Sequence, residues 1–161
     1  ESMQEWECGG EPSSLRGRVL DPEGNPIAGA VLDVWQNAAN MFYAVQQPDA
    51  QPATNLRGRY RTDSEGRFDI RGVRPTDYPI PADGPVGGLL EATGRHPWRA
   101  AHVHLKVSAD GFAPLTTHVF DDGSRYLRED TVFGVKDSLI GHFRLEDGLR
   151  VCDYDITLAR D

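Results

Sequence analysis

Two histidines in the stretch HVHLKV have the type and spacing of metal ligands. His102 and His104 are two residues apart in a run that alternates like a β-strand, so their side chains point to the same face. Apolar residues occupy the other face, which places the two histidines on the more polar side. Because imidazole is the commonest metal ligand in proteins, the pair is a candidate for two ligands of one metal ion. The alternative is a pair of packed histidines.

Two histidines do not complete a metal site, and the residues alone leave the other ligands open. A zinc site would need cysteine or carboxylate near the pair, and a non-haem Fe(II) site would need one carboxylate. Neither has a spacing signature here, because both cysteines are far away in sequence and no HxD or HxE accompanies the pair. Tyrosinate is a hard, strongly donating ligand that suits a trivalent ion. The available tyrosines are Tyr43, Tyr60, Tyr78, Tyr126 and Tyr154.

The composition fits one domain with a small partner. A chain of 161 residues can bury roughly two-thirds of the surface that it exposes when unfolded. The formal net charge of -8 argues against nucleic acid or an anionic membrane as a partner, because both require clustered Lys and Arg. No apolar run approaches the roughly 20 residues that span a bilayer. We therefore expect a soluble protein, with an N-terminal extension over residues 1–14 and a single domain over residues 15–161.

The ends of the chain carry two weaker expectations. The first residue is Glu1, which fits a mature form or an excised domain. Cys8 and Cys152 lie near opposite ends, and the ends of compact domains often lie close together, so a disulfide between them is one option. Two free thiols are the favoured alternative.

Short extended runs separated by Gly, Pro, Asp and Asn predict an all-β fold, either a β-sandwich or a partly closed barrel. The helical signal is thin, because no apolar periodicity of 3.6 residues lasts longer than a turn or two. DPEGNP and TDSEGR predict turns in which Asp bonds to its own backbone. The stretch from Asn40 to Leu56 lacks strand periodicity and predicts a long loop over one face. The extended runs are LRGRVL, AVLDVWQ, RGRYRTD, RFDIRGV, HVHLKV, LTTHVF and VCDYDITLA.

Three longer motifs resemble the catalytic domain of the intradiol ring-cleavage dioxygenases, the catechol and hydroxyquinol 1,2-dioxygenase family. They are RGRYRTDSEGRFDIRGVRPTDYPIPADGPVGGLL, GRHPWRAAHVHLKV and DTVFGVKDSLIG, in the family's order. The resemblance runs from about Leu15 to Phe143 and implies a β-sandwich with long loops over a metal site. The chain resembles the short form of the family, without the N-terminal helical segment of the intracellular members. An extracellular location is expected, with a cytoplasmic one as the alternative, and the oligomeric state is left open, a monomer included.

The resemblance implies a non-haem Fe(III) held by two tyrosines and two histidines. Tyr78 lies in the YPIP.DGPVG motif, and His102 and His104 lie in the R.aHvH motif. Tyr43 lies in the loop after VW and matches the first tyrosine ligand. Tyr60 stands where the family often has Phe, so it is not expected to be a ligand.

Three catalytic residues are implied as well. Tyr78 would leave the metal and accept a proton from the substrate. Arg99 would stabilise negative charge that develops on the ring. His118 stands in THVF, where catechol dioxygenases have glutamine, and is similar to the hydroxyquinol branch. It would donate to a substrate oxygen or orient Arg99.

The implied activity is insertion of both atoms of O2 into a catechol-type ring, of the catechol or hydroxyquinol class, to give a cis,cis-muconate-type product. A non-catalytic β-sandwich binding module is the alternative, because GRVLDPEGNPIAGAVLDVWQ followed by TDSEGRFDI also resembles transthyretin-like and collagen-binding-repeat modules. An Fe(II) oxygenase is disfavoured, because it would need a carboxylate ligand and none stands at a matching position.

Residues near these motifs carry weaker expectations. Trp35 and Trp98 flank the expected site in sequence and would line an aromatic pocket. Gly84, Pro85 and Gly87 are expected to shape a loop after the tyrosine motif.

Overall fold

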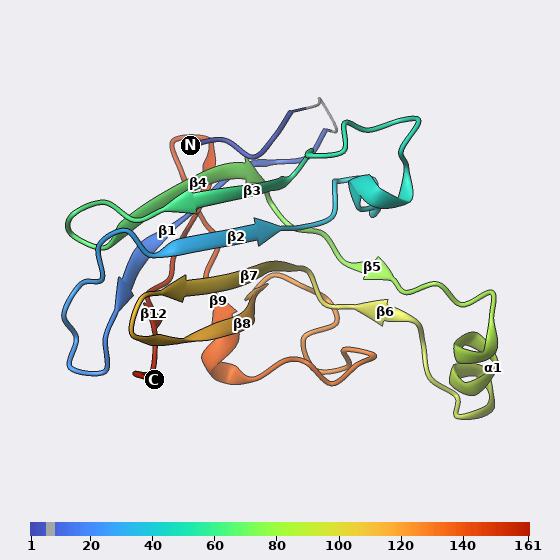
Figure 1. The fold of residues 1–161 in the computed structure, drawn as a ribbon. Helices are drawn as coiled ribbons and strands as arrows, with labels where there is room; N and C mark the ends of the chain where they lie inside the picture. The colour runs from blue at the N-terminus through green and yellow to red at the C-terminus, as the bar shows by residue number, and fades with distance from the viewer. Residues whose placement is uncertain (6–8) are drawn as a thin grey trace.

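In the part of the chain that the structure describes, two five-stranded sheets and a two-stranded ribbon make up the fold (Figure 1). The computed structural model describes residues 1–5 and 9–161. The first sheet has the order β10-β11-β1-β12 with β4 also paired to β1, and the second has the order β3-β2-β7-β8-β9. The strands of the first sheet are β1 (Pro12–Leu20), β4 (Arg67–Val73), β10 (Arg144–Glu146), β11 (Leu149–Asp153) and β12 (Ile156–Thr157). Those of the second are β2 (Val31–Trp35), β3 (Arg57–Arg61), β7 (His102–Ala109), β8 (Phe112–Asp121) and β9 (Ile140–Gly141).

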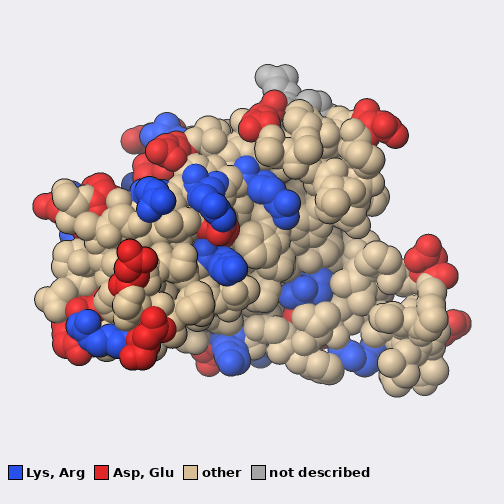
Figure 2. All heavy atoms as spheres, viewed as in Figure 1, with Lys and Arg blue, Asp and Glu red and all other residues tan. Residues whose placement is uncertain are grey.

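The core lies between these two sheets and confirms the predicted β-sandwich. Alternation along each strand sends one set of side chains inward, such as Ile70 of β4 and Leu105 of β7, which are 1% and 0% exposed. Each such side chain contributes roughly 1.5–3 kcal/mol when fully buried. The outward set on β3 consists of exposed arginines, and Figure 2 shows a row of basic side chains there. Tyr60 of β3 points the other way and is buried in the core.

The predicted strands and turns are present. Every predicted run overlaps a strand, and the last run is divided between β11 and β12. Asp21 and Asp63 each accept hydrogen bonds from the backbone N–H groups two and four residues later, as the two turn motifs predict. Gly24 and Gly66 have φ of 85° and 70°, a conformation that costs glycine little.

The two-stranded ribbon and a short helix lie beside the sandwich. β5 (Tyr78–Pro79) and β6 (Trp98–Arg99) form the ribbon, and α1 (Pro85–Ala92) lies between them in sequence (Figure 1). The prediction of a loop around Pro85 and Gly87 is wrong, because both residues lie in α1. Pro85 occupies the first turn, where its missing N–H costs nothing, and α1 is too short for a periodic apolar pattern to reveal it. The remaining helices are single turns, η1 (Ala44–Gln46) and η2 (Asp137–Leu139).

The N-terminal residues also pack on the sandwich. The backbone N–H of Met3 donates to the carbonyl of Arg71 at 2.9 Å, and the Met3 side chain is 4% exposed within the core. β1 begins at Pro12, three residues before the predicted start of the domain at residue 15. The division into an extension and a domain stays a prediction. None of the described helices is both long and apolar enough to cross a membrane.

Cys152 lies inside the core and has no disulfide partner among the described residues, and Cys8 lies outside them. The side chain of Cys152 is 0% exposed, and burial raises its pKa to about 12. The two options for Cys8 and Cys152, a disulfide and the favoured pair of free thiols, therefore both stay open.

We expect Cys152 to resist alkylation in the folded protein, because its thiol is buried and protonated at neutral pH. Iodoacetamide followed by peptide mass spectrometry should find it unmodified in buffer and modified in guanidinium chloride without reductant. Rapid modification of the folded protein would contradict the burial. Protection that persists in guanidinium chloride until a reductant is added would show a disulfide.

Candidate metal centre

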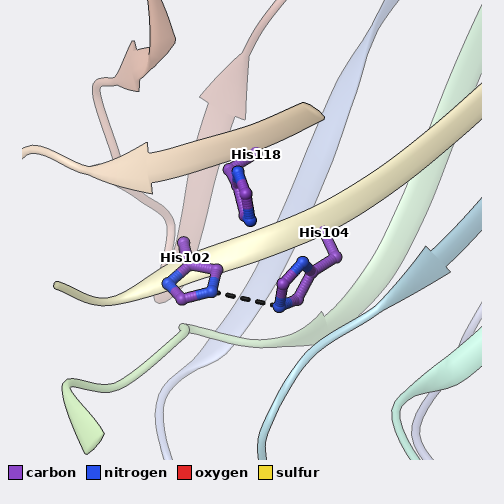
Figure 3. Close-up of side chains that lie close together, drawn as sticks. All are labelled: His102, His104 and His118. Carbon is purple, nitrogen blue, oxygen red and sulfur yellow. Dashed lines mark hydrogen bonds between the residues drawn. The ribbon is translucent and has the colours of Figure 1, made fainter. Parts of the chain in front are cut away.

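His102 and His104 lie on the face of β7 that points away from the core. Val103 and Leu105 between and after them are 2% and 0% exposed, which confirms the face predicted from the alternation. His102 is fully buried and His104 is partly buried. Their Nε2 atoms are 3.1 Å apart (Figure 3). The two histidines therefore direct their Nε2 atoms into the same space.

Two tyrosines from separate segments reach the same space. Tyr43 comes from the long loop that follows β2, and Tyr78 comes from the ribbon strand β5. Tyr43 Oη donates to Tyr78 Oη at 3.0 Å and lies 3.1 Å from His104 Nε2. The structure thus brings together the four side chains that the resemblance implies as ligands. Their role as ligands stays a proposal.

The other tyrosines lie elsewhere. Tyr126 stacks on Trp98, with ring centroids 5.3 Å apart, and Tyr154 Oη donates to the carbonyl of Ser138. Trp35 instead stacks on His104, with centroids 4.8 Å apart and an interplanar angle of 5°. Of the two expected tryptophans, Trp35 therefore contacts one of the four side chains, His104, and fixes the plane of its imidazole.

His118 joins the two histidines from the neighbouring strand. In the antiparallel pairing of β7 and β8, His118 is directly opposite His104. Its ring centroid is 4.6 Å from that of His104 and 5.0 Å from that of His102. One nitrogen from each of the three rings lies within 4.8 Å of the others (Figure 3). Finding this cluster from sequence would require the register of the two strands.

Arg99 is held by a carboxylate that the sequence analysis did not single out. Its Nε donates to Asp130 Oδ1 at 2.8 Å, and the two side chains are 10% and 1% exposed. Asp130 also accepts from the backbone N–H groups of Ala100, at 3.0 Å, and Gly134, at 2.8 Å. Burial alone would raise the pKa of Asp130, but these three hydrogen bonds outweigh it and lower the pKa. Asp130 therefore orients Arg99, and the role expected of His118 stays a prediction.

A second carboxylate holds the adjoining backbone. Asp77 accepts from the backbone N–H of Ala101 at 2.8 Å and from Ser124 Oγ. Between the two clamped peptides, the carbonyl of Ala100 contacts His102 Nδ1 at 2.6 Å. This bond requires a proton on Nδ1 and leaves Nε2 with a free lone pair. The irregular segment before β7 is thus fixed at both of its peptides.

Burial keeps the imidazoles neutral. It lowers the pKa of His102 to about 4 and that of His104 to about 2, and it lowers the pKa of His118 as well. Burial also raises the pKa of Tyr43, and the neighbouring Tyr78 raises it further. At neutral pH the candidate metal ligands are therefore neutral imidazoles and the phenol of Tyr43. This phenol loses its proton only when a strongly charged cation binds to its oxygen. Such a set fits a hard trivalent ion that converts phenols to phenolates.

Comparisons with known proteins place this arrangement in a family. A family model described as Dioxygenase matches residues 2–159. A hydroxyquinol 1,2-dioxygenase of Rhizobium sp. is 49% identical over 164 residues, covering 94% of this chain and 56% of the relative. A catechol 1,2-dioxygenase of Candida albicans is 42% identical over 156 residues, covering 91% of this chain and 52% of the relative. The chain spans about half the length of these curated relatives.

The fold agrees with solved structures. The structure of a hydroxyquinol 1,2-dioxygenase from Pseudomonas putida matches with a TM-score of 0.93 and 44% identity, covering 100% of this chain and 60% of that one. A chlorocatechol 1,2-dioxygenase from Pseudomonas putida matches with a TM-score of 0.91 and 38% identity, covering 99% of this chain and 65% of that one.

Asp130→Asn should lower the free energy of unfolding by about 3 kcal/mol, because it leaves the buried Arg99 without its counter-charge. Urea unfolding measures this change. Asp122→Asn is the matched control, since Asp122 pairs with the exposed His142, and it should change stability by less than about 0.5 kcal/mol. Equal unfolding midpoints for wild type and Asp130→Asn would show that Asp130 does not stabilise the fold by pairing with Arg99.

The ion pair of Arg99 and Asp130 also predicts that the free energy of unfolding depends on pH. The folded pKa of Asp130 is lower than that of an unfolded aspartate. Its contribution to stability is therefore complete above a pH of about 4 and lost as the pH falls through the folded pKa. In urea titrations from pH 6 to pH 2, wild type should lose more stability than Asp130→Asn. Parallel losses in the two proteins would exclude Asp130 as the source.

Proposed function

We infer that this chain, which belongs to the intradiol dioxygenase family, carries the catalytic centre of an enzyme that cleaves the ring of a catechol-type diol with O2. The observation that carries this proposal is the convergence of two phenols and two imidazoles, with successive donor atoms 3.0–3.1 Å apart. A binding module without chemistry does not account for that convergence. The alternative of a passive β-sandwich is therefore not favoured.

The metal that suits this site is a ferric ion. Tyr43, Tyr78, His102 and His104 would hold it, because two phenolates offset most of its charge and two neutral imidazoles complete the set. The chemistry that a ferric ion supplies in such a set is Lewis-acid activation of a chelated diol. His102 would bind through Nε2, because its Nδ1 carries the proton that is donated to the carbonyl of Ala100.

Tyr78 is the residue that we assign to proton transfer. It lies on the two-residue ribbon strand β5 and contacts Tyr43 and His102. The assignment rests on the resemblance, which gives this role to the tyrosine of the YPIP motif. Its phenolate oxygen would accept a hydroxyl proton when the diol binds, and the phenol so formed would turn away from the metal.

Arg99 and His118 would act on the bound ring. Arg99 is directly opposite Tyr78 in the β5–β6 pairing, so both side chains leave the same face of the ribbon. With Nε held by Asp130, the guanidinium is a fixed positive charge beside the site and would stabilise negative charge on the ring. His118 would donate a hydrogen bond to a substrate oxygen. Because catechol dioxygenases have glutamine at this position, a histidine here supports a hydroxyquinol-type substrate over catechol.

The ferric chain should be wine-red, because charge transfer from tyrosinate to Fe(III) absorbs visible light. Anaerobic addition of hydroxyquinol or catechol should shift the band to longer wavelength, and the stronger response identifies the substrate class. Tyr43→Phe and Tyr78→Phe should each weaken the band, and the double variant should abolish it. Tyr126→Phe is the control and should leave it unchanged. A chain that stays colourless with bound iron would contradict the proposal.

Arg99→Gln should lower kcat at least about 100-fold, the usual loss when a preorganised charge is removed from an active site. The visible band should persist, since Arg99 is not a metal ligand in this proposal. Oxygen uptake with hydroxyquinol measures the rate, and labelling with 18O2 should place two heavy atoms in the product. Unchanged kcat, or a product with one labelled oxygen, would contradict the proposed roles.

A further inference from the structure

A third histidine lies beside the two that the ferric site uses. His118 lies outside the set of two tyrosines and two histidines, yet its ring packs on both His102 and His104. One nitrogen of each ring lies within 4.8 Å of the others, and the Nε2 atoms of His102 and His104 are 3.1 Å apart. Figure 3 shows the three rings converging from two adjacent strands. Two donor sets therefore overlap at one pair of histidines.

The three-histidine set has the chemistry of a different metal. Three neutral imidazoles and a water molecule form a familiar zinc site, with Zn–N distances of about 2.0–2.1 Å. That geometry separates ligand nitrogens by about 3.4 Å, close to the spacing of His102 and His104. The three nitrogens lie within 4.8 Å of one another, so His118 reaches this spacing by moving about 1.4 Å, which side-chain rotation supplies. None of the three ligands must lose a proton, unlike the phenols of the ferric set.

The surroundings fix the shared pair and leave the third ring adjustable. The carbonyl of Ala100 holds His102 through Nδ1, and Trp35 stacks on His104. A bond from the second ring nitrogen to a carbonyl is the usual support of a zinc-bound histidine. His118 is partly buried, and its packing is against rings rather than through a hydrogen bond of its imidazole in the described structure.

We propose that His102, His104 and His118 form a second metal site that takes a divalent cation of the zinc type, and that this cation excludes the ferric ion because the two sites share His102 and His104. The binding of a divalent cation is independent of the proposed function, whereas the exclusion of iron rests on it. His118 would then determine which metal occupies the centre.

Titration of the metal-free chain with Zn²⁺ by calorimetry tests the second site. Wild type should bind one ion per chain. His118→Gln should weaken Zn²⁺ binding at least tenfold, because it removes one of three ligands. His142→Gln is the matched control, since His142 is exposed and remote from the cluster, and it should change the affinity less than twofold. Tyr78→Phe should change it less than threefold, because the phenol is not a ligand of this set.

Two results would overturn the second site. One is Zn²⁺ binding by His118→Gln as tight as by wild type, and the other is an equal loss in Tyr78→Phe. Because a variant can also fail to fold, nitrogen-15 NMR of histidine-labelled wild type gives a separate measurement. Zn²⁺ should shift the ring nitrogens of His102, His104 and His118 together and leave those of His96 and His142 unchanged. A shift without His118 would equally overturn the site.

Competition with iron tests the exclusion. Zinc-loaded wild type should develop no visible band with Fe(III) until a chelator removes the zinc, whereas His118→Gln should develop the band in the presence of zinc. A band that forms at the same rate with and without zinc in wild type would overturn the exclusion. If the metal-free wild type develops no band with Fe(III) at all, the proposed function fails, and the calorimetric comparison still decides the second site.

Discussion

The antiparallel register of β7 with its two neighbours is the constraint on which the centre depends. It pairs His104 with Trp35 of β2 on one side and with His118 of β8 on the other. A slip of one residue would turn both histidines of β7 into the core and expose Val103 and Leu105 to the site. Burial of the apolar face therefore holds the metal-binding face in place. The free energy gained by burying Val103 and Leu105 in the core therefore also fixes the side of β7 on which the imidazoles lie.

Where the sheet ends, two aspartates supply hydrogen bonds to the backbone before β7. At the point where Arg99 and His102 must be placed, Asp130 accepts the N–H of Ala100 and Asp77 accepts that of Ala101. Because Asp130 also holds the guanidinium, one carboxylate sets the position of a backbone segment and of a charged side chain. The position of Arg99 is therefore tied to that of the segment before β7.

Much of this architecture follows from local sequence, and the rest depends on contacts between distant segments. Alternation identifies the strands and the face of His102, and Asp at the start of a turn identifies the turns. Tyr43 and Tyr78 are ordinary tyrosines in their local context, so only the family resemblance selects them from five. Asp130 carries no local signal, because its partner Arg99 is 31 residues away in sequence. The helix α1 was missed because eight residues with two internal glycines carry too little periodicity.

The central claim is that two phenols and two imidazoles hold one ferric ion. A crystal structure of the iron-loaded chain, with anomalous diffraction measured at the iron absorption edge, tests it most directly. The account predicts one iron peak per chain, bonded to Tyr43, Tyr78, His102 and His104. A peak bonded to the three histidines without either tyrosine, or a peak remote from β7, would contradict it.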